Sequence, residues 1–226
     1  MISALTLQPT VTGDAVARYE RLSHGGSLWH DIMPNAADGT LSGDGSWWPN
    51  FVTGDSNYVA IGNPAKLDFS SAFTLCAWAY QNPDPPIQGG EYLIGKDGLA
   101  AGTRNVGLST ADNNALISGF IFPSGSAGSF AAVQYDADTG VQHFSVLVNE
   151  GGGGDLLLYV DGVLRATNAG KGDPISWTPG TPWELGRRQD GSDYLTGSMD
   201  TVRFYDRALS ADEILRDYHA GKPAHP

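Results

Sequence analysis

Acidic side chains are the first candidates for chemistry in this chain. Asp and Glu together number 25, but only five are glutamates: Glu20, Glu91, Glu150, Glu184 and Glu213. Glycoside hydrolysis needs two carboxylates that face each other across the sugar, about 5.5 Å apart in retaining enzymes. An E-x-D-x-E run would aim such acids into one groove by strand alternation, and the sequence has none. We therefore expect no glycosidase.

Other catalytic patterns are also missing. There is no G-x-S-x-G, no H-E-x-x-H and no glycine-rich loop that leads into a helix. The five histidines are scattered without metal-ligand spacing. The single cysteine, Cys76, lies in the alternating run AFTLCAWAY and is predicted to be a buried small hydrophobe. The sequence predicts a protein that is not an enzyme.

Composition favours one all-β domain. The chain has 226 residues with 30 Gly and 13 Pro, which is typical of many short strands joined by tight turns. Five Asp-Gly pairs add turn signals, because both residues tolerate positive φ. The net charge of −12 and the lack of any Lys/Arg run argue against nucleic acid or an anionic membrane as a partner.

Strand signals recur about every 10 to 15 residues, with no helices between them to build parallel units. The spacing predicts an all-β, two-sheet antiparallel jelly-roll sandwich. Residues 1–14 are expected to form an N-terminal arm, 15–221 the domain and 222–226 a tail, with 31–50 as a loop. The expected strands are 15–24, 57–61, 72–80, 91–95, 105–109, 115–122, 130–135, 141–148, a hairpin over 156–167, 183–186 and 199–206.

The end of the chain has its own pattern. In MDTVRFYD, alternation places Met199 on one face of a strand and Val202 and Phe204 on the other. Ser210 and Glu213 then form an S-x-x-E capping box, so one short helix is expected to run from there to Gly221. The predicted buried residues are Leu75, Trp78, Leu93, Leu157, Tyr159, Val202 and Phe204.

Several fragments occur in a characteristic order: DIMPNAADGTL, GDSNYVAIG, FTLCAWAYQ, YLIGKDG, LLLYVDGVLRAT and ELGRRQDGSDYLTGSMDTVRFYDRALSADEI. Together they resemble laminin G-like and pentraxin-like jelly rolls of the concanavalin A-like lectin/glucanase superfamily. The resemblance covers about residues 15–221. It implies a binding or structural module, since this fold hosts many unrelated sites.

The resemblance also implies where calcium would lie. Pentraxin-like members bind it with an Asp-Asn pair on one loop and a Glu-Gln-Asp run on another. Asn105, Gln189 and Asp190 match that pattern, but Arg104 and Arg188 stand where acids are expected. Two guanidinium groups oppose a hard dication, so no cofactor is expected to be required. One structural calcium at Asp200 stays open, because many relatives hold one with the acid that opens the last core strand.

Two adjacent tryptophans, Trp47 and Trp48, offer flat apolar faces that can stack on sugar rings. Adjacent residues of an extended segment point in opposite directions, so one of them at most is expected to face a ligand. The alternative is that both pack onto the sandwich.

Two functions remain open. The first is a non-catalytic phage virion component (capsid decoration, tail or receptor-contact protein) that contacts protein subunits, surface glycans or both. The second is a lectin-like, carbohydrate-binding module of a bacterial protein, with or without calcium. MISALTLQPTVTG has no basic start or long apolar run, so no signal peptide is expected. The expectation is synthesis in the cytoplasm, incorporation into a virion and an arm suited to docking or to a homo-oligomer.

Overall fold

The fold is seen in a computed structural model of the chain. The structure describes residues 15, 17–20, 28–31, 38–42, 50–51, 57–69, 71–82, 90–98, 100, 103–111, 116–124, 129–138, 140–178 and 180–221. The predicted arm (1–14), the predicted tail (222–226) and both Trp47 and Trp48 lie outside these residues.

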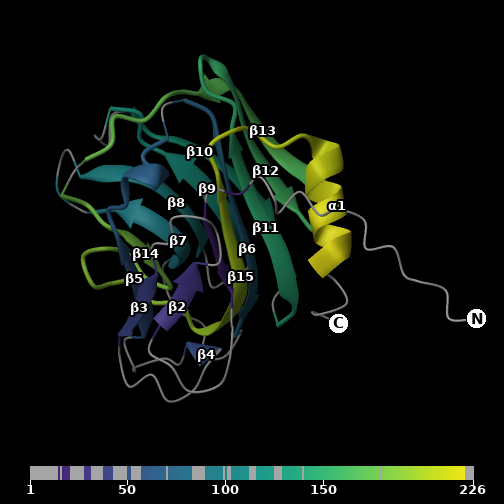
Figure 1. The fold of residues 1–226 in the computed structure, drawn as a ribbon. Helices are drawn as coiled ribbons and strands as arrows, with labels where there is room; N and C mark the ends of the chain where they lie inside the picture. Colours follow the sequence, from purple (N-terminus) through teal and green to yellow (C-terminus); the bar gives the residue numbers. More distant parts are fainter. Residues whose placement is uncertain are drawn as a thin grey trace, which may run out of the picture.

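Two antiparallel sheets face each other (Figure 1). The front sheet has the strand order β10 (Ala131–Asp136), β9 (Leu116–Ile121), β8 (Arg104–Ala111), β7 (Glu91–Asp97), β14 (Trp183–Leu185), β5 (Tyr58–Gly62) and β3 (Gly39–Ser42). The back sheet has the order β13 (Val163–Gly172), β12 (Gly154–Val160), β11 (Gln142–Asn149), β6 (Phe73–Gln81), β15 (Gly197–Tyr205) and β1 (Ala17–Glu20). Strand β2 (Leu28–Asp31) pairs with β1 and with β3, and the short β4 (Asn50–Phe51) pairs with β15. The predicted jelly-roll sandwich is confirmed.

The main core fills the space between the sheets. Leu75, Leu93, Val202 and Phe204 are fully buried there, as predicted. A β-bulge in β15 between Met199 and Val202 changes the alternation, so Met199 joins the same core. The prediction that Met199 faces the other way was wrong, because alternation alone cannot show an inserted residue.

The predicted C-terminal helix, α1 (Ala211–Gly221), packs on the outer face of the back sheet (Figure 1). The capping box is confirmed: the Ser210 amide donates to Glu213 Oε2 at 2.8 Å, and the Glu213 amide donates to Ser210 Oγ at 3.4 Å. The largest cause of the low pKa of Glu213, about 2, is its hydrogen bond from Arg207. Among the described residues, no helix is long and apolar enough to cross a membrane.

A second buried cluster lies between α1 and the back sheet. It holds Trp78 and Tyr159, so these two residues are buried as predicted, but under the helix rather than between the sheets. Leu157 packs against the same cluster and stays partly exposed, which corrects its predicted burial. Its neighbours Leu156 and Leu158 take the places in the main core.

The strand predictions hold for β5 to β15 within one or two residues at most ends, with β13 extending further than expected. The prediction of a loop over residues 31–50 was wrong at its two ends, Asp31 in β2 and Asn50 in β4, and for 39–42. Residues 39–42 form β3 and pair with both β2 and β5. Their Gly and Ser content is typical of turns, and only the pairing with neighbouring strands makes them extended.

Candidate functional site

A small aromatic cluster lies on the outer face of the front sheet. Tyr92, Phe120 and Phe122 pack together there, separately from the main core. On β9, Phe120 alternates with Ile121, which belongs to the main core, so the two side chains lie on opposite faces of the sheet. The rings lie across strands that carry glycine: the Tyr92 ring covers Gly95, and the Phe120 ring covers Gly107.

Phe130 extends this aromatic surface into solvent. Its ring centroid lies 5.1 Å from Phe122 and 6.1 Å from Phe120. The pairing of Ala131 with Ile121 places Phe130 beside Phe122 in the register of β9 and β10. Phe130 is 55% exposed, the largest value among the exposed large hydrophobic residues that the structure describes.

Several hydrogen-bonded polar side chains of β7 and β8 lie beside these aromatic rings. Asp97 and Arg104 are directly opposite each other in the sheet, and Arg104 Nε and Nη2 donate to the two carboxylate oxygens at 3.0 and 2.9 Å. The Tyr92 hydroxyl donates to Asp97 Oδ2 at 2.6 Å. The Arg104 guanidinium lies 4.0 Å above the Phe122 ring. The contacts therefore form a closed circuit from Tyr92 through Asp97, Arg104, Phe122 and Phe120 back to Tyr92.

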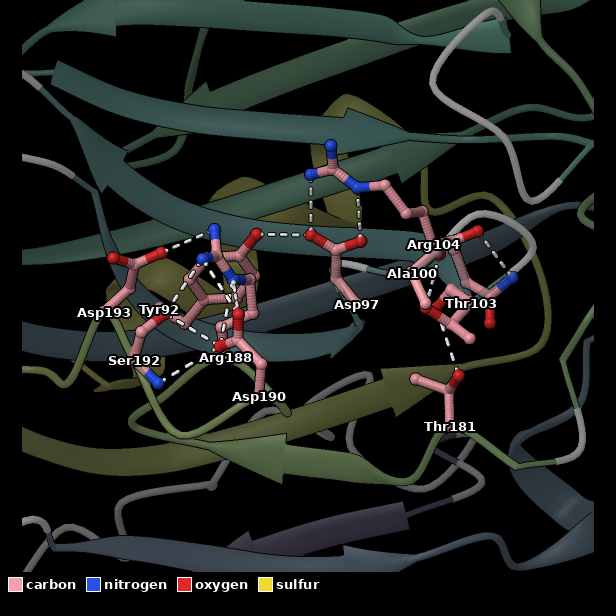
Figure 2. Close-up of polar contacts among 11 residues, drawn as sticks. Tyr92, Asp97, Ala100, Thr103, Arg104, Thr181, Arg188, Asp190, Ser192 and Asp193 are labelled. Carbon is pink, nitrogen blue, oxygen red and sulfur yellow. Dashed lines mark hydrogen bonds and ion pairs between the residues drawn. The ribbon is translucent and has the colours of Figure 1, made fainter.

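The turn after β14 adds a second arginine. Arg188 Nη1 lies 2.7 Å from Asp193 Oδ2, and its Nη2 lies 3.1 Å from Asp190 Oδ2. Its Nη2 also donates to Ser192 Oγ at 2.9 Å. Arg188 lies 6.0 Å from the Tyr92 ring, next to the first circuit (Figure 2). We call Tyr92, Asp97, Arg104, Phe120, Phe122, Phe130 and Arg188 the aromatic–arginine cluster.

Burial and neighbouring groups determine the protonation states of Tyr92 and Arg104 in this cluster. Burial raises the pKa of the Tyr92 hydroxyl, and the neighbouring Asp97 raises it further, so Tyr92 stays a neutral donor. The hydrogen bonds to Asp97 raise the pKa of Arg104, so the guanidinium stays charged. The cluster offers an exposed ring beside fixed hydrogen-bonding groups.

Asn105, one of the predicted ligand residues, is fully buried on β8. Its Nδ2 donates to the carbonyl oxygens of Arg104 and Ser176 at 2.9 and 3.2 Å, and its Oδ1 accepts from the Thr178 amide at 3.3 Å. These bonds attach the 176–178 segment to the front sheet. A ligand role for Asn105 stays a prediction.

Gln189 and Asp190, the other two residues of the predicted calcium pattern, lie on the turn after β14. Gln189 Oε1 lies against Gly98, where an added Cβ would be 2.8 Å from it. Asp190 Oδ1 accepts from Arg188 Nε and from the Ser192 amide and hydroxyl, at 3.2, 3.1 and 2.7 Å. This turn thus lies against the end of β7 at Gly98, and a ligand role for Gln189 and Asp190 stays a prediction.

The residues that the structure describes at this junction do not fit a calcium ion. Both oxygens of Asp97 and both oxygens of Asp190 accept hydrogen bonds from arginine. A hard dication needs about six to eight oxygen ligands, and here it would have to displace two guanidinium groups. Arg104 binds its acid within the β7–β8 hairpin, and Arg188 binds its acids within the turn after β14, at the positions where the family pattern has acids and a metal.

Asp200, the predicted metal ligand, lies in the bulged part of β15 and is half-buried. Within the residues that the structure describes, no group of three or more His, Cys, Asp and Glu is close enough to hold a metal ion. A structural calcium at Asp200 stays a prediction, and so does a ligand role for Trp47 or Trp48.

The two glutamates of the front sheet have different surroundings. Glu184 receives two hydrogen bonds from Arg187, at 2.7 and 2.8 Å. Glu91 is fully buried, and burial raises its pKa to about 7. A glycosidase pair would place both carboxyl groups on one open groove, and a fully buried Glu91 does not do so.

Sequence reasoning did not find the aromatic–arginine cluster. The alternation of Phe120 and Phe122 in GFIF was a signal, since it places two rings on one face of a strand. Nothing in the sequence showed that Phe130, after a loop, would return beside Phe122, or that the unexpected Arg104 would pair with Asp97.

Two facing antiparallel sheets with a C-terminal helix on the outer face of one of them define a jelly-roll sandwich of the concanavalin A-like class. The model of a family described as the Concanavalin A-like lectin/glucanases superfamily matches residues 53–215. The chain belongs to this family, because the match covers most of its length.

Solved structures with the same fold include binding domains of botulinum neurotoxins. The binding domain of serotype D/C VPI 5993 aligns with a TM-score of 0.67 and 11% identity, over 92% of this chain and 52% of that one. The D/C binding domain in complex with rat synaptotagmin II gives 0.68 and 11%, over 93% and 52%. A structure of botulinum neurotoxin type C, a toxin whose cell entry is dependent upon interaction with two ganglioside molecules, gives 0.66 and 10%, over 92% and 51%. The chain spans about half the length of these structures, and at such identities the likeness establishes the fold.

Proposed function

We propose that this chain is a non-catalytic, lectin-like module that binds glycans through the aromatic–arginine cluster. The observation that carries the proposal is the exposed ring of Phe130, held on Phe120 and Phe122 beside the Arg104–Asp97 pair. Sugar rings have apolar faces that stack on aromatic rings and hydroxyl edges that need directed hydrogen bonds.

The groups around Phe130 supply both kinds of contact. Arg104 is 24% exposed, and its Nη1 points away from Asp97 (Figure 2). Stacking on Phe122 and the bonds to Asp97 hold the guanidinium in one orientation, so little conformational entropy is lost when a ligand binds. Cell entry of the structurally similar type C neurotoxin, 51% of whose chain is covered, is dependent upon interaction with two ganglioside molecules.

The test is binding to a broad glycan array, followed by titration of the strongest oligosaccharide with two matched variants. Phe130→Ala removes an exposed ring at the cluster, and Leu164→Ala removes an exposed side chain on β13. We expect Phe130→Ala to weaken binding by about tenfold or more, and Leu164→Ala to leave it unchanged. Equal effects of the two substitutions, or no binding to any glycan, would overturn the proposal.

The absence of catalysis has its own test. Glu91 and Glu184 are the two glutamates in the strands of the front sheet. Replacing each singly with Gln should leave any measured glycan hydrolysis at the level of the wild-type protein, whereas a loss of hydrolysis in either variant would restore the enzyme hypothesis.

For the biological setting, we propose incorporation into a phage virion, as a decoration, tail or receptor-contact subunit. A module with one cysteine and a net charge of −12 needs no disulfide framework and avoids nucleic acid. Val163, Leu164 and Leu215 are exposed near the β12–β13 turn and α1, on the opposite side from the cluster, and suit contact with a neighbouring subunit. Detection of the protein in purified particles would support this setting, and its absence from them would exclude it.

A further inference from the structure

The positive charges of the aromatic–arginine cluster are already neutralised within the protein. Arg104 forms a bidentate pair with Asp97, whose side chain is 0% exposed. Arg188 pairs with two carboxylates, Asp190 and Asp193, at 3.1 and 2.7 Å. No guanidinium of this cluster is left with a positive charge that lacks a carboxylate partner.

The arginine that follows the neighbouring strand β14 is also paired with a carboxylate. Arg187 lies 3.2 Å above the Tyr58 ring and pairs with Glu184 at 2.7 Å. These ion pairs thus set three arginines against four carboxylates, an excess of one negative charge. The whole chain, these groups included, carries a net charge of −12.

From this balance we infer that the site takes uncharged glycans and rejects acidic ones, such as uronate-containing, sialylated or sulfated sugars. The inference rests on the proposed glycan-binding function and adds the class of ligand. A sugar hydroxyl can accept from an arginine that is already paired and can donate to the remaining carboxylate lone pairs. A ligand carboxylate or sulfate would meet Asp190 and Asp193 without an unpaired cation to offset the repulsion.

Asp193 is the residue whose charge is best tested. Its backbone has φ of 52°, a conformation that Asn also tolerates, so Asp193→Asn preserves the turn. The substitution leaves Arg188 with one full counter-charge, from Asp190, and removes the excess negative charge of these ion pairs. Asp206→Asn makes the same change in net charge at an exposed position between β15 and α1, which serves as the matched control.

The experiment compares matched probes: an oligogalacturonide with its methyl ester, and sialyllactose with lactose. Within a recognised pair, we expect the uncharged member to bind at least about tenfold more tightly than the acidic member. The difference between the two affinities should become smaller as the salt concentration is raised. Asp193→Asn should strengthen binding of the acidic member severalfold relative to the uncharged member, while Asp206→Asn should leave the ratio of the two affinities unchanged.

The outcomes separate the two proposals. Binding of the acidic member as tightly as the uncharged one, or an equal response to both substitutions, would overturn the charge selectivity while leaving glycan binding in place. If neither these probes nor any glycan of the array is bound, the proposed function itself fails, and the selectivity fails with it.

Discussion

Gly107 lies directly beneath the aromatic ring of Phe120. The two residues are Cα partners on β8 and β9, and a Cβ at position 107 would overlap the ring. Glycine at this point lets the ring lie flat on the sheet, where it supports both Phe122 and Phe130. The shape of the candidate site thus depends on a residue that has no side chain.

Gly107→Ala should therefore displace Phe120 and disturb the surface that Phe130 presents. We expect a loss of about 1–3 kcal/mol in the free energy of unfolding, as for other overpacked sites, together with weaker glycan binding. Gly180→Ala is the control, because a Cβ there meets nothing within 4 Å. Denaturant titrations of both variants would check this, and equal stabilities would contradict the described packing.

Val202 tests the register of the last core strand. Its side chain is fully buried in the main core on β15. Val202→Asp would place an unpaired charge there, and we expect the variant to lose more than about 4 kcal/mol of stability or not to fold. A melting temperature equal to that of the wild-type protein would show that the side chain does not face the core.

The buried ion pair under α1 gives a further prediction. Asp217 Oδ2 lies 3.1 Å from Arg203 Nη1 and accepts from the Tyr205 hydroxyl at 2.9 Å. Asp217→Asn would leave Arg203 charged and buried without its counter-ion, at a cost of about 3–5 kcal/mol. Replacing both partners by Met and Leu should recover most of this loss, and a double variant that is no more stable than Asp217→Asn would contradict the assignment.

His143 predicts a dependence of stability on pH. Its Nδ1 lies 2.8 Å from Asp161 Oδ2, and this hydrogen bond is the largest cause that raises the pKa of His143 above 6.5. A raised pKa in the folded state means that the stabilisation is complete below about pH 6.5 and is lost as the pH rises through the folded value. Wild type should exceed His143→Gln in stability by more at pH 5 than at pH 9, as denaturant titrations at both pH values would show.

The ionisation of Glu91 also lowers stability as the pH rises, so its contribution to the pH dependence has to be separated from that of His143. Burial raises the pKa of Glu91 from 4.5 to about 7, so its ionisation also reduces stability as the pH rises between those values. This contribution is common to wild type and His143→Gln and cancels in their difference. A stability difference that stays constant with pH would contradict the His143–Asp161 ion pair.

The sequence predicted the architecture better than the site. Alternation and turn signals located the strands from β5 onward, and the capping box at Ser210 located the helix. The bulge before Val202 and the strand at 39–42 depend on partners far along the chain, so local patterns did not reveal them. The cluster depends on tertiary structure in the same way, because Tyr92, Phe120 and Phe130 come from separate strands or their ends.

Removal of divalent metal distinguishes the two calcium hypotheses. Because Arg104 and Arg188 occupy the oxygens of Asp97 and Asp190, we expect chelation to leave glycan binding unchanged. A chelator that abolishes binding would contradict this account of the loop junction. A structural calcium at Asp200 would appear separately, as a melting temperature that falls on chelation in wild type and not in Asp200→Asn.

The most direct test of the central claim is an NMR titration of the ¹⁵N-labelled protein, in chelator, with the strongest uncharged oligosaccharide from the array. The account predicts that the shifted amide signals belong to β7, β8, β9 and the start of β10, around Tyr92, Arg104, Phe122 and Phe130. Shifts confined to α1 and β13, or no shifts at saturating sugar, would contradict glycan binding at the aromatic–arginine cluster.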